Sequence, residues 1–450
     1  PLDPTNAWVV FSGYSSGNKV FETSNGGTSW TKTSGTTDIF DGSGQAYYDM
    51  ALAVSSTNEN EIYTGCLNVW KSTNGGTSAT RINNWSNPSG ISYTHADIHY
   101  LGFHGTKLFC GSDGGIYVSE NSGINFTDLT AGVQISQFYK IAVSKQSAAN
   151  MVGGLQDNGG HAYSGGLWKN YYGADGMDTA VDPTNPNLYY GFIQNGSSMY
   201  ISNSAGNGLS SSVSSPGGIN GNWVTPLTSN SIGEIFSGFD NLYKLTGGAW
   251  VQQNTDALGG GNIDLITIDP SNNNIIYVAN GTVLYKSVNG GVNFSPINFT
   301  TNNIESIAVH STDSNIIYLT TDGSTGEVLQ SNDGGTSFID ISNGVPNIGK
   351  NIIIHQGRNT DNPLYLGTSL GVYYRDDSMA AWAPFDMNLP NVSVTDLEIN
   401  LEDAKLIAAT YGRGIWQTDI PVQLATDDIK FLSIKNPTAD INCGSTVTPK

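Results

Sequence analysis

Charged residues are scarce in this chain of 450 residues, where they make up only 12% of the sequence. Long stretches rich in Leu, Ala, Glu and Lys are missing, which argues against a helical protein. No apolar run reaches the roughly 18 residues that a transmembrane helix needs, so we expect no membrane insertion. The three cysteines, Cys66, Cys110 and Cys443, are too few for a disulfide framework and lack the CxxC spacing of a zinc site.

Basic residues are also few. The chain has 18 Lys and Arg against 38 Asp and Glu, which gives a net charge of -20. This excess of negative charge repels phosphate backbones and anionic lipid. We therefore expect no nucleic-acid partner.

Glycine and aromatic residues, by contrast, are plentiful. The chain has 55 Gly, 22 Tyr and 9 Trp, and 38% of its residues are hydrophobic. That supply of apolar side chains is enough for a core and argues against a disordered chain. The composition predicts a folded protein that is rich in turns and strands.

One octet recurs along the chain. Its clear copies begin at Thr23, Ser72, Ser119, Ser287 and Ser331, and a degenerate copy ends at Trp382. With weaker copies in the long gap, the period is about 41 to 50 residues. Each repeat reads as two strands, a third strand that ends at Ser or Thr, a Gly-Gly hairpin, and an aromatic residue that opens a fourth strand. Four short strands in such a repeat are typical of a propeller blade.

The octet has the form S/T-x-N/D-G/S-G-x-x-W/F and resembles the Asp box, or bacterial neuraminidase repeat. We expect its first hydroxyl to satisfy the hairpin backbone, and its aromatic residue to be buried between blades. Those aromatic residues are Trp30, Phe126, Phe294 and Phe338. The repeats predict an all-β fold over residues 1–420, namely one closed β-propeller of nine or ten four-stranded blades with Asp-box hairpins. Two stacked smaller propellers are the alternative.

Residues 421–450 depart from the repeat. The runs Ile429–Ile434 and Cys443–Pro449 resemble the first strands of an immunoglobulin-like module, so a partial module or linker is expected here. The first blade starts late and the last has three strands. We therefore expect the chain to be part of a longer multidomain protein.

Blades three to five carry polar segments that the other blades lack. The candidate ligand-binding residues are His95, Asp97, His99, Asp113, Gln156, Asp157, Asn158, Asp175 and Gln194. They lie at the starts of inner strands or just after second strands, and both places surround the central channel of a propeller. We expect them to converge on one polar patch at the channel mouth. The alternative is that these Asp and Asn side chains only satisfy their own turns.

The HxDxH segment within this set predicts more specific chemistry. On a strand, His95, Asp97 and His99 alternate onto one face. Two imidazoles and a carboxylate are suited to a divalent cation or to general acid and base catalysis. In the alternative interpretation they hydrogen-bond to loop backbones at the channel mouth.

The chain as a whole resembles sortilin-like Asp-box proteins of the kind exported by bacterial type IX secretion. The HxDxH segment, Asp113–Ser119, Gly154–Gly159 and Ala409–Trp416 carry this resemblance. It implies a location outside the cell or on the outer cell surface. It also implies further immunoglobulin-like and sorting modules, and it leaves the activity open.

Three enzyme classes make different demands on the sequence. Sialidases need three convergent arginines, and the four in this chain, Arg81, Arg358, Arg375 and Arg413, are not arranged to supply them. Two-propeller xyloglucan-type glycosidases use paired aspartates, which Asp97 and Asp175 resemble. Propeller polysaccharide lyases use His and Tyr chemistry, which His95, His99 and Tyr93 permit.

The function predicted from these features is binding. We expect a secreted or cell-surface propeller that binds a glycan, a peptide or a partner protein through its channel or top face. The density of Tyr, Trp and Asn fits sugar stacking and hydrogen bonding to either kind of ligand. The alternative is a polysaccharide-active enzyme, a glycosidase or lyase, with its site around His95, Asp97, His99 and Asp175.

Overall fold

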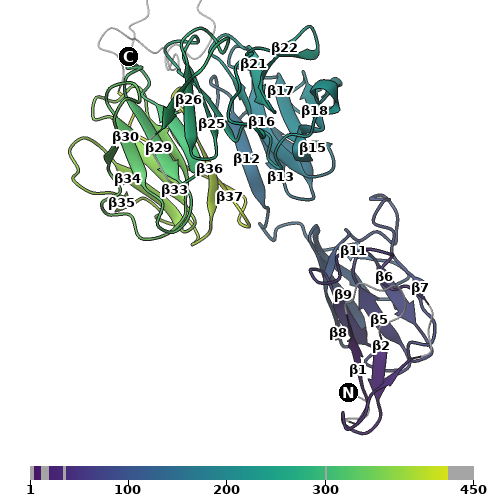
Figure 1. Cartoon of the computed structure of the whole chain (residues 1–450). Helices are drawn as coiled ribbons and strands as arrows, with labels where there is room; N and C mark the ends of the chain where they lie inside the picture. The colour runs from purple at the N-terminus through teal and green to yellow at the C-terminus, as the bar shows by residue number, and fades with distance from the viewer. Residues whose placement is uncertain (1–4, 12–19, 34–36, 299–301, 424–450) are drawn as a thin grey trace, which may run out of the picture. The chain divides into compact units, whose positions relative to one another are not determined.

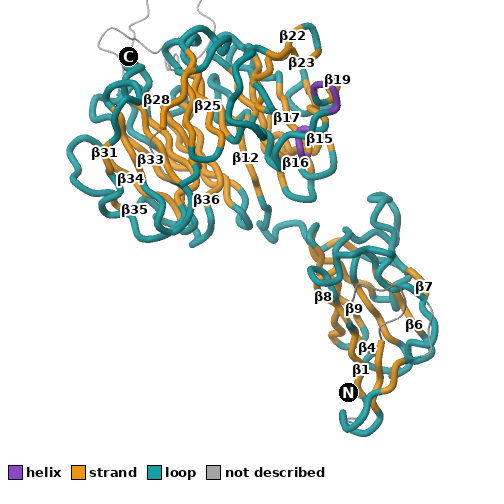
Figure 2. Tube along the Cα trace, in the orientation of Figure 1, coloured by secondary structure: helices purple, strands orange, loops and turns teal. Residues whose placement is uncertain are grey.

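The predicted all-β class is confirmed by a computed structural model that describes residues 5–11, 20–33, 37–298 and 302–423 (Figure 1). These residues form ten antiparallel sheets, eight with four strands and two with three. The only helical elements among them are two short turns, η1 (Gln194–Gly196) and η2 (Pro216–Gly218), drawn in purple in Figure 2. No described helix is long and apolar enough to cross a membrane.

The sheets belong to two compact units, residues 1–135 and 136–450. Residues 1–420, which the repeats predicted as one propeller, therefore contain two units. Residues 421–423 form no strand, and the runs predicted to begin an immunoglobulin-like module lie outside the described residues.

Unit 1 contains three sheets that are stacked in chain order. Their strands are β1 (Ala7–Val10), β2 (Val20–Thr23) and β3 (Thr31–Lys32); β4 (Ala51–Val54), β5 (Ile62–Gly65), β6 (Val69–Ser72) and β7 (Thr80–Arg81); and β8 (Ile98–His104), β9 (Lys107–Ser112), β10 (Gly115–Ser119) and β11 (Thr127–Asp128). Each sheet is a meander in which consecutive strands pair. Tyr63, Leu108 and Cys110 are fully buried in the core between the second and third sheets.

Unit 2 contains seven sheets of the same meander type. The first four comprise β12 (Phe138–Val143), β13 (Met151–Leu155), β14 (Gly159–Ser164) and β15 (Leu167–Tyr172); β16 (Gly176–Val181), β17 (Tyr189–Ile193), β18 (Ser198–Ser202) and β19 (Ser211–Ser214); β20 (Leu227–Ser229), β21 (Ile235–Gly238), β22 (Leu242–Thr246) and β23 (Ala249–Gln252); and β24 (Leu265–Ile268), β25 (Ile276–Asn280), β26 (Val283–Ser287) and β27 (Ser295–Asn298). The last three comprise β28 (Ile304–Val309), β29 (Ile317–Thr321), β30 (Val328–Ser331) and β31 (Ile339–Asp340); β32 (Lys350–His355), β33 (Leu364–Thr368), β34 (Gly371–Arg375) and β35 (Ala383–Pro384); and β36 (Val394–Asn400), β37 (Lys405–Thr410) and β38 (Ile415–Asp419).

The first strands of these seven sheets form a closed ring. Each packs against the next in chain order, and β36 returns to pack against β12. The closure is fixed by side chains: Asp396 Oδ2 accepts a hydrogen bond from the Ile141 amide at 2.9 Å, and Thr395 Oγ1 donates one to the Phe138 carbonyl at 2.7 Å. Unit 2 is therefore a seven-bladed propeller, and the nine or ten predicted blades do not form one ring.

The repeated octets form the hairpins that were expected of them. The first hydroxyl of each accepts a hydrogen bond from the amide of the glycine four residues later, at 2.8 to 3.1 Å, in the boxes that begin at Thr23, Ser72, Ser119, Ser287 and Ser331. That glycine also touches the preceding sheet. In Gly291, φ is +87° and an added Cβ would lie 2.5 Å from Leu242. A side chain at this position would therefore strain the hairpin and push two sheets apart.

The aromatic residue that ends each octet follows the prediction only in part. Phe126 is buried, and Phe294 and Phe338 are half-buried against neighbouring cores. Trp30 was predicted to be buried, but it is 42% exposed. Its ring instead lies over its own hairpin, 3.9 Å from the position of a Cβ on Gly27.

Candidate functional site

The HxDxH segment of unit 1 is not the regular strand that was predicted. Strand β8 begins only at Ile98, and Asp97 has a φ of +60°, in the left-handed region. His95, Asp97 and His99 therefore do not alternate along one strand face. Because β8 also has a bulge between Ile98 and Tyr100, His99 occupies an extra position in the ladder.

Two of these residues nevertheless meet Asp113, which follows β9. His99 Nε2 lies 2.7 Å from Asp113 Oδ1, and the Tyr48 hydroxyl donates to Asp113 Oδ2 at 2.9 Å. The rings of Tyr48 and His99 are in edge-to-face contact, with centroids 4.7 Å apart. Carboxylate oxygens of Asp97 and Asp113 lie within 4.8 Å of each other. The result is a compact acidic group in which one carboxylate is held by an imidazole and a phenol.

Burial and neighbouring carboxylates alter the chemistry of Asp97. Burial raises the pKa of Asp97 above its ordinary value, and Asp49 and Asp113 raise it further, while a hydrogen bond from Gln45 Nε2 acts in the opposite direction. His95 lies beside this group, because a Cβ on Gly114 would fall 2.1 Å from its ring. The divalent-cation site at His95, Asp97 and His99 stays a prediction.

In unit 2, the polar turn after β13 is clamped against the turn before β16. The Asp157 amide donates to Asp175 Oδ1 at 2.8 Å, and Asn158 Nδ2 donates to the Gln156 carbonyl at 3.0 Å. The approach is close enough to demand glycine, because a Cβ on Gly159 would lie 1.9 Å from the Tyr172 carbonyl oxygen. These candidates thus satisfy their own turns, as the alternative interpretation proposed, and they also assemble one polar surface.

That surface continues through aromatic residues that the sequence analysis did not single out. Trp223 Nε1 donates to the Tyr139 hydroxyl at 3.2 Å, and this hydroxyl donates to Gln156 Oε1, also at 3.2 Å. The ring of Tyr139 lies against Tyr411, with centroids 5.8 Å apart. Trp223 is 48% exposed, so about half of its surface is accessible to a ligand.

Gln194 joins the same surface through the loop that carries Trp223. The Asn195 amide donates to the Trp223 carbonyl at 3.1 Å, and the Gly221 amide donates to the Asn195 carbonyl at 2.8 Å. The side-chain oxygen of Gln194 is buried and accepts no hydrogen bond from any residue that the structure describes. We define the channel mouth as Tyr139, Gln156, Asp175, Gln194 and Trp223.

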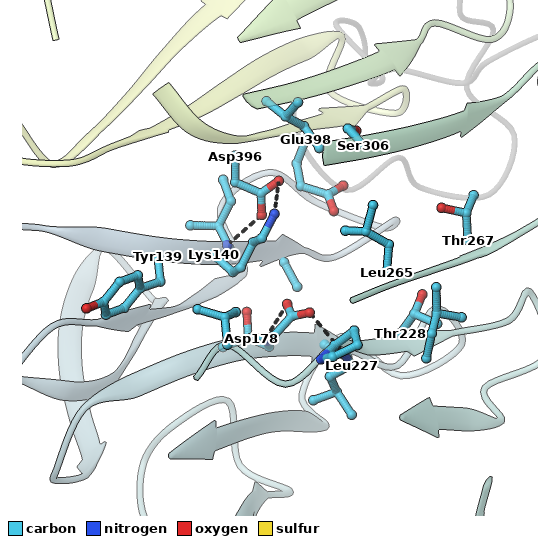
Figure 3. A pocket seen from close by; sticks show the side chains of 18 of the residues that line it. Tyr139, Lys140, Asp178, Leu227, Thr228, Leu265, Thr267, Ser306, Asp396 and Glu398 are labelled. Atoms are coloured by element: carbon cyan, nitrogen blue, oxygen red, sulfur yellow. Dashed lines mark hydrogen bonds and ion pairs between the residues drawn. The ribbon is translucent and has the colours of Figure 1, made fainter. Parts of the chain in front are cut away.

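Below the channel mouth, the first strands of all seven sheets line a central cavity of about 510 Å³. Its charged side chains are Lys140, Lys145, Asp178, Asp264, Glu305, Asp396 and Glu398. Figure 3 shows Lys140 directed toward Asp396, with Asp178 and Glu398 nearby. Tyr139 belongs to both the channel mouth and the cavity, so the aromatic surface opens directly into the acidic channel.

The channel carboxylates and Lys140 shift one another's ionisation. Burial acts to lower the pKa of Lys140, but Asp396, Asp178 and other carboxylates outweigh it and leave the pKa above its ordinary value. Burial raises the pKa of Asp178 to about 7, although Lys140 and the Leu227 amide act against this. The Leu227 amide donates to Asp178 Oδ2 at 2.8 Å, so this carboxylate also links β16 to β20.

The structure thus brings the predicted residues together in two groups. One, in unit 1, contains His95, Asp97, His99 and Asp113; the other, in unit 2, contains Gln156, Asp157, Asn158, Asp175 and Gln194. Because the groups belong to different units, the single patch stays a prediction. Tyr139 and Trp223 were missed because aromatic residues are dense throughout the chain, and only a loop position before an inner strand distinguishes Trp223 from core residues.

No known protein family matches this sequence, and no curated protein does. Among solved structures, the chain is similar to a GH74 enzyme of Niastella koreensis, with a TM-score of 0.36 and 14% sequence identity. The match covers 93% of this chain and 82% of that chain. Strand pairing and ring closure within this chain define its propeller.

Proposed function

We propose that this protein binds glycans and that its binding site is the channel mouth of unit 2. The observation that carries the proposal is the half-exposed indole of Trp223, which is linked by hydrogen bonds to Tyr139 and Gln156. A sugar ring presents an apolar face of C–H groups that packs on an aromatic ring. Its hydroxyls need donors and acceptors beside that ring, and amides and carboxylates supply them.

The surroundings of Trp223 meet both requirements. Asp175 and Gln156 are linked through the turn that contains Asp157, and the Tyr139 hydroxyl lies between Gln156 and the indole. The cavity beneath is within the size range of small-molecule sites. Its excess of carboxylates over lysines favours neutral or amino sugars over acidic ones.

The test is a glycan array followed by titration of the best ligand. We expect Trp223→Ala to weaken binding by at least about tenfold, as loss of a stacking aromatic residue would. Trp168→Ala is the matched control, because Trp168 on β15 is 44% exposed but lies outside the channel mouth. Equal loss in both variants, or no glycan ligand for the wild type, would refute the proposal.

A second candidate function is polysaccharide cleavage at the acidic group of unit 1. The observation in its favour is the pair Asp97 and Asp113, whose carboxylate oxygens lie within 4.8 Å while burial raises the pKa of Asp97. A carboxyl with a raised pKa is suited to act as general acid, and Asp113, held by His99 and Tyr48, is suited to act as nucleophile or base.

This second function predicts release of reducing ends from a polysaccharide. Asp97→Asn would abolish that release and leave binding at Trp223 unchanged. Glycan binding without cleavage by the wild type under any condition would leave binding as the sole function. The location outside the cell, implied by the resemblance to type IX-secreted proteins, is part of the proposal and is tested by fractionating the source cells.

A further inference from the structure

The last blade of unit 2 differs from the other six because it has three strands. Its outermost strand is β38, and no described strand pairs with its outer edge. The Thr410 amide donates to the Gly414 carbonyl, and the Ile420 amide donates to the Ala404 carbonyl. Gly414 and Ile420 therefore belong to hydrogen-bonded pairs with β37, and in an antiparallel ladder every second residue does so. The main-chain groups of the residues between them, Ile415, Gln417 and Asp419, point away from β37.

A groove of about 560 Å³ runs beside this edge. One wall is β38, and the other is the segment 384–389 that follows β35. Its apolar surface includes Trp416, 36% exposed, and Met387, 92% exposed. A strand edge that no described strand covers, beside an apolar groove, is a template for pairing with another strand.

The complete blades show what fits such a groove. In the sheet β20–β23, Trp250 on the fourth strand is 9% exposed and its ring stacks on Phe192 of the preceding sheet, with centroids 5.9 Å apart. A fourth strand therefore supplies both main-chain hydrogen bonds to the third strand and apolar side chains to the space between two blades. The last blade provides the edge and the space but no described strand.

We propose that the outer edge of β38 binds an extended segment of a partner polypeptide in which apolar and basic side chains alternate. The apolar side chains would enter the groove, and the main chain would pair with Ile415, Gln417 and Asp419. Basic side chains suit the site because Asp386 lines the groove, the other lining carboxylate, Asp419, is held by Lys405, and the whole chain carries a charge of -20. This recognition mode is strand addition to a sheet edge.

The test uses the full chain and a synthetic eight-residue peptide that alternates Lys and Val, with free ends blocked. We expect saturable binding by titration, and slower amide hydrogen exchange at Gln417 and Asp419 in the complex. A peptide of the same length that alternates Glu and Val should bind at least about tenfold more weakly.

Two variants separate strand addition from nonspecific adhesion. Gln417→Pro removes an outward amide that the β37 ladder does not use, so the fold should persist while binding falls about tenfold. Gln417→Ala keeps that amide and should bind like the wild type. Equal binding by both variants overturns the proposal. The proposal is also overturned if the Gln417 amide is protected from hydrogen exchange without peptide, because the edge is then already occupied. Light scattering tells which occupant is present: in a monomer it is residues 424–450, and in a dimer it is a second copy of the chain.

Discussion

The turn at the end of the first strand of a blade can be held by different buried polar side chains. Asp269 Oδ1 accepts hydrogen bonds from the Ser271 and Asn272 amides, at 2.7 and 3.1 Å. In the next blade His310 Nδ1 accepts the equivalent bonds from Thr312 and Asp313, at 3.2 and 3.1 Å. An imidazole that accepts at Nδ1 carries its proton on Nε2, which lies 2.9 Å from Asn362 Oδ1, so His310 can take the place of the Asp carboxylate in this turn.

A second histidine, His355, makes this region sensitive to acid. His355 stacks on His310 with centroids 4.1 Å apart, beside Tyr318, and burial and His310 lower the pKa of His355 to about 3. Because its folded-state pKa lies below the unfolded value of about 6.5, its contribution to stability is complete above pH 6.5 and is lost as pH falls toward 3. Asp377 and Arg375 are the charged groups that act on Tyr318 from the neighbouring sheet.

We therefore expect His310→Asp to lose less stability than the wild type between pH 6.5 and 4. The Asp side chain can accept both turn amides, as Asp269 does, and it replaces an imidazole that lowers the pKa of His355 with a carboxylate, which raises that pKa. Urea unfolding at a series of pH values measures this effect. If the free energy of unfolding falls with pH equally in the two proteins, the histidine pair does not cause the loss of stability in acid.

Two aromatic residues at equivalent octet positions should differ sharply in their effect on stability. Phe126 is 8% exposed within the core of unit 1, whereas Trp30 is 42% exposed. We expect Phe126→Ala to lower the free energy of unfolding by about 3 to 5 kcal/mol, and Trp30→Ala by under about 1 kcal/mol. Similar losses in chemical denaturation would contradict the burial described here.

At the scale of elements, the octet hairpin was predictable and the HxDxH segment was not. The hairpin depends on local chemistry: a hydroxyl, an Asn or Asp, and glycines that accept positive φ are all readable in the sequence. The HxDxH pattern also reads as a strand. However, Asp97 adopts a left-handed conformation and a bulge follows at His99, and both depend on the turn from the preceding sheet.

The hydroxyl that opens each hairpin should matter more than an exposed turn residue. Ser287 is fully buried and accepts the Gly291 amide at 2.9 Å. Ser287→Ala leaves that buried amide without its acceptor and should lower the free energy of unfolding by about 1 to 3 kcal/mol. Ser287→Thr is the control, because Thr23 forms the same bond in the first octet. If both variants unfold like the wild type, the hydroxyl is dispensable.

At the scale of the whole molecule, the repeat period predicted blades correctly but could not show where a ring closes. Ten blade-like sheets were within the predicted range. Closure depends on contacts between β12 and β36, more than 250 residues apart, such as the bond from the Ile141 amide to Asp396. Sequence periodicity reports only neighbouring repeats, so it gave no sign that seven of them form a separate ring.

Ring closure predicts that unit 2 is stable without unit 1. Each of its seven sheets is packed on both sides, so a chain of residues 136–450 should be soluble and unfold in a single transition. Residues 1–135 have exposed aromatic side chains, Phe11 just after β1 at 55% and Tyr100 on β8 at 59%, and should be less soluble alone. Calorimetry of both fragments tests this. An unfolded unit 2 fragment would contradict the closed ring.

The candidate site could be predicted in part. Its polar residues were recognisable because they interrupt the repeat, whereas Tyr139 and Trp223 became visible only when the ring placed the loop before β20 beside β12. The central claim is that this aromatic and polar surface binds a sugar. The most direct measurement is a crystal structure of the chain with the best ligand from the glycan array. We predict a sugar ring stacked on Trp223, with hydroxyls hydrogen-bonded to Gln156 or Asp175; a ligand bound elsewhere, with Trp223 bare, would contradict the claim.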